Sequence, residues 1–200
     1  MKIAVYGATG NIGTQIVAEA LRRGHTVTGI SRSGTEVAGV TAVRADLADT
    51  ATFSTIAGAH DAVVISLGPS RTGEPASLLV DAHRAVVNSA PTSRIFVVGG
   101  AGSLVVGDTL LKDTPDFPDA YKPSAAIMTE VLDVYQASSG IDWTVLSPAP
   151  MIGPGERTGT FTVGTNSPVG ASISQEDFAV AVLDELENPH HRGARFTVAN

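Results

Sequence analysis

The stretch that decides the fold is Gly7-Ala8-Thr9-Gly10-Asn11-Ile12-Gly13. It follows an apolar run at 2–6 (KIAVY) and precedes a segment at 14–23 (TQIVAEALRR) whose apolar residues recur at helical spacing. A strand, a glycine-rich turn and a helix in this order form the first part of a β-α-β unit. The pattern therefore predicts an α/β protein whose first loop lies at the carboxyl edge of a parallel sheet.

The three glycines of this loop have separate physical uses. Gly7 permits a tight turn, Gly10 removes a Cβ where the backbone approaches a pyrophosphate, and Gly13 lets the helix pack close to the sheet. The N–H groups of the first helical turn then face the phosphates, and the helix dipole favours their charge. The spacing Gly-x-x-Gly-x-x-Gly differs from the Gly-x-Gly-x-x-Gly of many dehydrogenases, and a glycine-rich turn without a ligand is the alternative. The predicted cofactor contacts of the loop are Gly7, Thr9, Gly10, Asn11, Ile12 and Gly13.

The rest of the chain continues this alternation of short apolar runs and amphipathic segments, which indicates a parallel sheet with right-handed crossovers. The run at 61–66 (DAVVIS) is typical of a strand that is buried on both faces. Further strands are predicted at 26–30, 40–45, 94–98, 143–146 and 195–198. Further helices are predicted at 51–57, 75–90, 125–138 and 175–186.

Length and composition limit the class of protein. The 200 residues fit one domain over 1–200, and 43% hydrophobic with 16% charged residues fits a folded chain. A net charge of −7 disfavours nucleic acid as a partner, and the absence of cysteine excludes disulfides, thiolate nucleophiles and cysteine-ligated metals. Met1-Lys2 leads directly into the first predicted strand without a signal-peptide pattern, and no apolar run approaches the ~20 residues of a membrane helix. We therefore expect a cytoplasmic protein with no membrane partner.

Two long stretches interrupt the alternation. The stretch at 99–123 is rich in Gly, Asp and Pro, and the stretch at 148–170 is rich in Gly and Pro. Long irregular segments in a compact domain are usually functional loops. Because both follow predicted strands, they should emerge at the carboxyl edge of the sheet and form substrate loops.

The end of the second predicted strand indicates which dinucleotide is bound. NAD-specific sites usually have an acidic residue there, which accepts from the ribose 2′-hydroxyl. This chain has Ser31-Arg32-Ser33 instead. Arg32 could bind a 2′-phosphate by charge, with hydrogen bonds from Ser31 and Ser33, although a solvated surface arginine is the alternative. The pattern favours NADP(H) over NAD(H).

Acidic residues follow the third predicted strand. Asp46 could reach the adenine amine, or it could cap the next segment. Asp49 or Thr50 is the better candidate for the cap of the helix that begins near Ala51. Asp46 is therefore a candidate cofactor contact.

Several motifs resemble those of one group of proteins: GATGNIG at 7–13, SRS at 31–33, ADL at 45–47, VVGGAGSL at 97–104, and the segment 173–200. The chain resembles the atypical short-chain dehydrogenases/reductases. In particular it is similar to the NmrA-like, NAD(P)H-binding group, whose members are often named NADH-flavin reductases and which is related to biliverdin reductase B. The resemblance implies a Rossmann-type, doubly wound sheet with strand order 3-2-1-4-5-6 and an added strand. It also implies a small C-terminal substrate lobe and a nicotinamide dinucleotide, usually NADP.

The chain departs from the ordinary short-chain dehydrogenases at the catalytic pair. Those enzymes use Tyr-x-x-x-Lys, in which the lysine lowers the pKa of the tyrosine for proton transfer. Here Ala125 stands four residues after Tyr121, and Ser139 four residues after Tyr135. The usual proton relay between alcohol and ketone is therefore absent from this pattern. Hydride transfer to an oxidised flavin such as FMN suits such a site, because the acceptor ring delocalises charge and water can supply the proton.

The segments after the fourth, fifth and sixth predicted strands should build the substrate pocket. Leu67 and Gly68 would pass beside the nicotinamide ribose, and Arg71 could meet an acidic substrate or stay solvated. Ser103 could hydrogen-bond the substrate or the nicotinamide amide, or it could be a turn hydroxyl. Tyr121 could donate a proton or form a pocket wall. Ser103 and Tyr121 are the catalytic candidates.

These patterns favour an NADPH-dependent oxidoreductase that reduces a small planar molecule such as a flavin or quinone. A non-catalytic NADP(H)-binding sensor of NmrA type is the alternative, and a dehydratase or epimerase is a weaker one. The histidines lack carboxylates at metal-ligand spacing, so no metal is expected. We expect a monomer or a homodimer.

Overall fold

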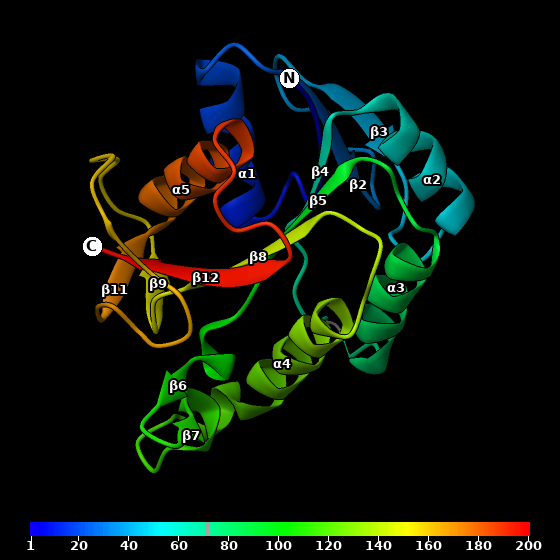
Figure 1. The fold of residues 1–200 in the computed structure, drawn as a ribbon. Helices are drawn as coiled ribbons and strands as arrows, with labels where there is room; N and C mark the ends of the chain where they lie inside the picture. Colours follow the sequence, from blue (N-terminus) through cyan, green and yellow to red (C-terminus); the bar gives the residue numbers. More distant parts are fainter. Residues whose placement is uncertain (71–72) are drawn as a thin grey trace.

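The computed structural model describes residues 1–70 and 73–200, and its centre is an eight-stranded sheet (Figure 1). The order across the sheet is β10-β12-β8-β5-β4-β1-β2-β3, in which only the edge strand β10 runs antiparallel to its neighbour. The strands are β1 (Lys2–Tyr6), β2 (Thr26–Ser31), β3 (Thr41–Arg44), β4 (Ala62–Ile65), β5 (Arg94–Val98), β8 (Trp143–Pro148), β10 (Thr162–Gly164) and β12 (Ala194–Ala199). Counted along the sheet, the first six strands have the order 3-2-1-4-5-6, so the predicted Rossmann-type fold is confirmed.

Helices cover both faces of the sheet. On one face lie α1 (Asn11–Arg22) and α5 (Gln175–Glu187), and on the other lie α2 (Thr50–Ala59), α3 (Ser77–Asn88) and α4 (Lys122–Gln136) (Figure 1). Side chains of β1 alternate between the two layers: Ile3 and Val5 join the α1/α5 core, and Ala4 and Tyr6 join the other. Because both faces are covered, the central strands are apolar at nearly every position.

Helix boundaries differ from the predicted ones by a few residues. α1 begins at Asn11, so the glycine-rich loop contributes the first helical turn. α4 begins at Lys122 with Pro123 in its first turn, where proline lacks only an N–H that has no helical partner. α2 has its N-cap at Asp49, whose carboxylate accepts from Thr52 N at 3.1 Å, and this confirms the predicted cap.

The two stretches predicted as loops contain short elements. The first holds a hairpin, β6 (Val105–Val106) with β7 (Thr109–Leu110), and three 3₁₀ turns: η1 (Ala101–Ser103), η2 (Leu111–Asp113) and η3 (Asp119–Tyr121). The second holds β9 (Met151–Gly153), which pairs in parallel with β11 (Ser172–Ser174). Elements of two or three residues carry no readable periodicity, so the sequence pattern does not reveal them.

Candidate functional site

The glycine-rich loop lies where β1, β2 and β4 end together. Gly7 has a φ of +78°, and a Cβ there would lie 2.2 Å from the carbonyl oxygen of Ser66. Its N–H donates to Ile30 O at 3.0 Å, which ties the loop to the end of β2. This point has β2 on one side of β1 and β4 on the other, so it is the topological switch point at which α/β sheets bind ligands.

Gly13 and Gly10 differ in what surrounds them. A Cβ at Gly13 would lie 2.0 Å from the carbonyl oxygen of Gly7, so only glycine lets α1 start this close to the loop. A Cβ at Gly10 would meet the same oxygen at 3.3 Å and is otherwise open. Thr9, Gly10 and Asn11 are exposed, whereas Ile12 packs against the α1/α5 core.

The N-terminus of α1 suits an anionic ligand. Its N-cap is Gly10, which has no side chain to accept from the first-turn N–H groups, and residues 11–14 include no acid. By contrast, Asp49 caps α2, and Ser174 caps α5 by accepting from Asp177 N at 2.9 Å. The uncapped donors and the positive end of the helix dipole fit a pyrophosphate at this loop.

A hollow lies at the ends of β2 and β3. It has a volume of about 370 Å³ and is lined by Arg32, Arg44, Ala45 and Asp46. The register pairs Ser31 with Arg44, and Arg44 Nε donates to the carbonyl oxygen of Arg32 at 3.1 Å. Two arginine residues therefore line one hollow. Sequence reasoning missed Arg44, although its place at the end of the strand next to β2 was a usable signal.

The predicted partners of Arg32 are engaged within the turn. Ser31 Oγ accepts from the N–H groups of Gly34 and Thr35 at 3.0 and 3.2 Å, and Ser33 Oγ lies 2.7 Å from Thr35 Oγ1. Arg32 Nη1 donates to both carboxylate oxygens of Glu74, at 2.9 and 3.1 Å. The side chain that was predicted to meet a 2′-phosphate thus already holds an anion from another segment.

Asp46 lies at the same hollow. Tyr6 is buried on the sheet, near the carboxylates of Asp46 and Asp49. Asp46 Oδ1 accepts from Ala48 N at 2.9 Å, as in an Asx turn, and Asp46 is one of the residues that line the hollow. Burial, together with the charges of Asp49 and Asp46, raises the pKa of Tyr6. The Tyr6 hydroxyl is therefore a protonated donor, and it has no hydrogen-bond partner within residues 1–70 and 73–200. The adenine contact of Asp46 stays a prediction.

The segment after β4 lies against the glycine-rich loop. Leu67 is half-buried, and its Cδ2 lies 3.0 Å from the position a Cβ would take at Gly7. Gly68 has open space where its Cβ would be. Arg71, for which the sequence left a contact with an acidic substrate and a solvated side chain as alternatives, lies outside the described residues.

The two catalytic candidates lie in different surroundings. Ser103 is buried in η1, and its Oγ accepts from Arg195 Nη1 at 3.2 Å. Tyr121 lies at the start of α4 and is 65% exposed. The Ser103 hydroxyl bonds to Gly100 O and Arg195 and not to Tyr121, and both catalytic roles stay predictions.

Arg195 connects the two predicted substrate loops. This buried residue of β12 donates to Ser103 in the first loop and to Asn166 Oδ1 in the second, the latter at 2.9 Å. Val105 N also donates to Asn166 O at 2.8 Å. Burial lowers the pKa of Arg195. Sequence reasoning placed this residue in a strand but gave it no role, because its partners are distant in the sequence.

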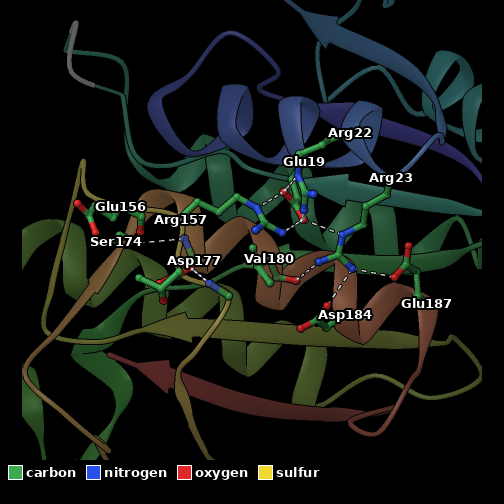
Figure 2. A network of polar contacts seen from close by, with 12 residues as sticks. Glu19, Arg22, Arg23, Glu156, Arg157, Ser174, Asp177, Val180, Asp184 and Glu187 are labelled. Carbon is green, nitrogen blue, oxygen red and sulfur yellow. Dashed lines mark hydrogen bonds and ion pairs between the residues drawn. The ribbon is translucent and has the colours of Figure 1, made fainter.

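A polar network fixes the second loop to the helices on the α1/α5 face (Figure 2). The buried carboxylate of Glu19 on α1 accepts from Arg22, Arg23 and Arg157, with Arg157 Nε at 2.8 Å. Asp177 on α5 accepts from Thr158 Oγ1 and Gly159 N at 2.6 and 2.7 Å. The helix that begins at the glycine-rich loop therefore also anchors the second predicted substrate loop.

The side chains of His60 and His191 form hydrogen bonds with other protein groups and do not cluster as metal ligands. His60 contacts Ile56 O and Thr28 Oγ1, and His191 contacts Glu185 Oε2. Within residues 1–70 and 73–200, no group of three or more His, Asp or Glu side chains could hold a metal ion. In the same ranges no helix is long and apolar enough to cross a bilayer.

A family model described as NAD(P)H-binding matches residues 7–189, which include the glycine-rich loop, both predicted substrate loops and α5. The chain belongs to the NAD(P)H-binding family. Its predicted resemblance to this group is thereby confirmed, and the uncapped start of α1 fits the nicotinamide dinucleotide that the family binds. Which residues contact the dinucleotide stays a prediction.

Three similar proteins extend the comparison over the whole NAD(P)H-binding chain. It is 41% identical to the uncharacterized protein YwnB of Bacillus subtilis, covering 100% of this chain and 99% of the relative. A solved structure from Burkholderia pseudomallei, provisionally named an exported protein, is 40% identical, with a TM-score of 0.89 and 100% of both chains covered. The SP1627 protein of Streptococcus pneumoniae, provisionally named an NADH-flavin reductase, is 33% identical, with a TM-score of 0.92 and 100% and 99% covered.

Proposed function

We propose that this protein is an oxidoreductase that transfers hydride from NADPH to a flavin, quinone or similar planar acceptor. The observation that carries the proposal is the uncapped N-terminus of α1 at the switch point, with Gly7 and Gly13 in positions that only glycine fits. The name of the Streptococcus pneumoniae relative supports the choice of a flavin as acceptor. The Tyr-x-x-x-Lys pair that alcohol chemistry would use is missing at Tyr121 and Tyr135.

The proposed reaction requires the protein mainly to bind the two reactants and to orient their rings. NADPH supplies a hydride, the oxidised flavin accepts it together with a proton from water, and NADP⁺ and reduced flavin leave. Such a reaction is accelerated mainly by holding two rings in contact. The segment with Leu67 and Gly68 and the loops joined by Arg195 are the parts of this chain that would position them.

The preference for NADPH rests on the hollow beside β2 and β3. Arg32 and Arg44 lie next to it, and the sequence 31–33 has no acid that would accept from a ribose 2′-hydroxyl. A guanidinium pairs with phosphate through charge-assisted hydrogen bonds. Asp46 at the same hollow is the proposed adenine contact.

Replacing Arg32 with alanine tests that preference. We expect the affinity for NADPH to fall roughly tenfold, because a charge-assisted hydrogen bond contributes about 1.5–3 kcal/mol when it is not fully solvent-exposed and less when it is. The affinity for NADH should change by less than about twofold. Titrations of both cofactors by calorimetry, with Arg84→Ala on α3 as the control, measure the difference. Equal losses for the two cofactors would remove the 2′-phosphate role.

One observation favours the alternative, a non-catalytic NADP(H)-binding sensor. Ser103, a catalytic candidate, is buried and already bonded to Arg195. A sensor needs a dinucleotide site but no side chain that reacts with a substrate. A Ser103 hydroxyl that is already bonded to Arg195 is compatible with such a protein.

NADPH oxidation by the purified protein, with and without FMN, separates the two functions. We expect turnover that depends on FMN and that is lost in Gly10→Val, since that variant blocks the start of α1. Binding of NADPH is followed in the same samples. Tight binding without turnover on FMN or a quinone would exclude the proposed reductase and favour the sensor.

A further inference from the structure

The carboxylate of Glu74 binds the side chain that the proposed NADPH site needs. Glu74 lies between β4 and α3, 42 residues from Arg32 in the sequence, and both of its oxygens accept from Arg32 Nη1, at 2.9 and 3.1 Å. Carboxylates and phosphates both bind guanidinium groups through negatively charged oxygens that accept from its N–H groups. The two anions would compete for the same donors.

We propose that Glu74 is a specificity-determining residue, whose carboxylate competes with the cofactor's 2′-phosphate for Arg32 and lowers the preference for NADPH over NADH. This inference rests on the proposed role of Arg32. NADH has no 2′-phosphate, so the pair between Glu74 and Arg32 can stay intact when NADH binds. A 2′-phosphate of NADPH can bind Nη1 of Arg32 only after the Glu74 carboxylate has left that nitrogen.

The pair is suited to displacement. The side chains of Arg32 and Glu74 are 65% and 48% exposed, and an exposed ion pair is weak. The hydrogen bond from Arg32, followed by one from Ser70, lowers the pKa of Glu74, so its carboxylate is charged at neutral pH. A 2′-phosphate carries more negative charge and more acceptor oxygens than the carboxylate, so it wins the competition.

Displacement also has a cost after NADPH has bound. Glu74 belongs to the segment that joins β4 to α3, which keeps its charge in the neighbourhood of the new phosphate. Like charges placed together oppose binding.

Glu74→Gln tests the inference because glutamine keeps the size and removes the charge. We expect the dissociation constant of NADPH to fall roughly two- to fivefold, which is the range of an exposed ion pair, and that of NADH to stay unchanged. Raising the salt concentration should shrink the difference. The control is Glu36→Gln, which removes an exposed acid four residues after Arg32. Calorimetric titrations of the wild type, Glu74→Gln and Glu36→Gln with each cofactor give the six dissociation constants.

The double variant Arg32→Ala with Glu74→Gln separates this inference from the proposed function. On the Arg32→Ala background, Glu74→Gln should tighten NADPH binding by less than it does in the wild-type protein. Only the like-charge repulsion, and not the competition for Arg32, is then left to remove. If Arg32→Ala weakens both cofactors equally, the 2′-phosphate role fails. If Arg32→Ala weakens NADPH selectively but Glu74→Gln changes nothing, only the competition fails. If Glu36→Gln tightened NADPH binding as much as Glu74→Gln does, the change in net charge would explain both effects. That result would also overturn the inference.

Discussion

Replacement of Gly10 with valine is expected to abolish dinucleotide binding while the fold stays intact. Gly10 has φ −80° and ψ 166°, an extended conformation that valine adopts readily. Its Cβ would meet only the carbonyl oxygen of Gly7, at 3.3 Å, which a small shift accommodates. The branched side chain would then cover the uncapped N–H groups of α1, where the pyrophosphate is proposed to lie. We expect the affinity for NADPH to fall roughly a hundredfold or more.

The matched control for this variant is Gly58→Val. Gly58 lies in α2 with open space around its Cβ position, and it borders a hollow at the amino edge of the sheet, away from the loop. Its substitution should leave NADPH binding unchanged. Circular dichroism and thermal unfolding check that both variants are folded, and calorimetry measures binding. A Gly10→Val protein that is folded and still binds NADPH would contradict the assignment of this loop. Gly13 is unsuitable for the test, because its Cβ would lie 2.0 Å from backbone.

Replacement of Glu185 with glutamine is expected to lower the free energy of unfolding by about 3–5 kcal/mol, because it leaves a buried cation without its partner. Glu185 and Arg94 have side chains that are 3% and 5% exposed, and Glu185 Oε1 lies 2.7 Å from Arg94 Nη2. The carboxylate also accepts from His190 N, His191 N and His191 Nδ1, at 2.9, 2.8 and 2.8 Å. Urea denaturation measures the loss, and Asp81→Asn, in an exposed pair with Arg84, should cost less than about 1 kcal/mol.

The same carboxylate gives a pH dependence with a defined sign. Burial alone would raise the pKa of Glu185, but hydrogen bonds from His191, Arg94 and His190 outweigh it and hold the pKa below its ordinary value of 4.5. A lowered folded-state pKa stabilises the protein at pH values above the unfolded pKa, and this contribution is lost as pH falls through the folded pKa. The wild type should therefore lose stability below about pH 4.5, and Glu185→Gln should lose less over that range. Parallel curves for the two proteins would contradict this role.

The fold could be predicted because its signals are local. The apolar run at 2–6, the glycines of 7–13 and the buried run at 61–66 each fix an element through neighbours in the sequence. The strand order came from a resemblance and not from spacing. The hairpin β6–β7 could not be predicted, because a strand of two residues is too short to show an alternation of apolar and polar side chains.

The site could be predicted only in part, because some of its groups depend on contacts between distant segments. The glycine-rich loop and Arg32 lie at the ends of predicted strands, where the fold itself makes them candidates. The ion pair of Arg32 with Glu74 and the bonds of Arg195 with Ser103 and Asn166 join residues that are 42, 92 and 29 positions apart. Nothing in the local pattern marks such partners.

The placement of α1 and α5 on one face has a consequence for synthesis. These helices come from opposite ends of the chain and lie side by side (Figure 1). Until residues 175–187 have been synthesised, the apolar side of α1 and the sheet face next to it lack the helix that packs against them. Uncovered apolar surface is what aggregates and what chaperones bind. Nascent chains that stop before α5 should therefore be held by chaperones, and release should coincide with emergence of that helix from the ribosome.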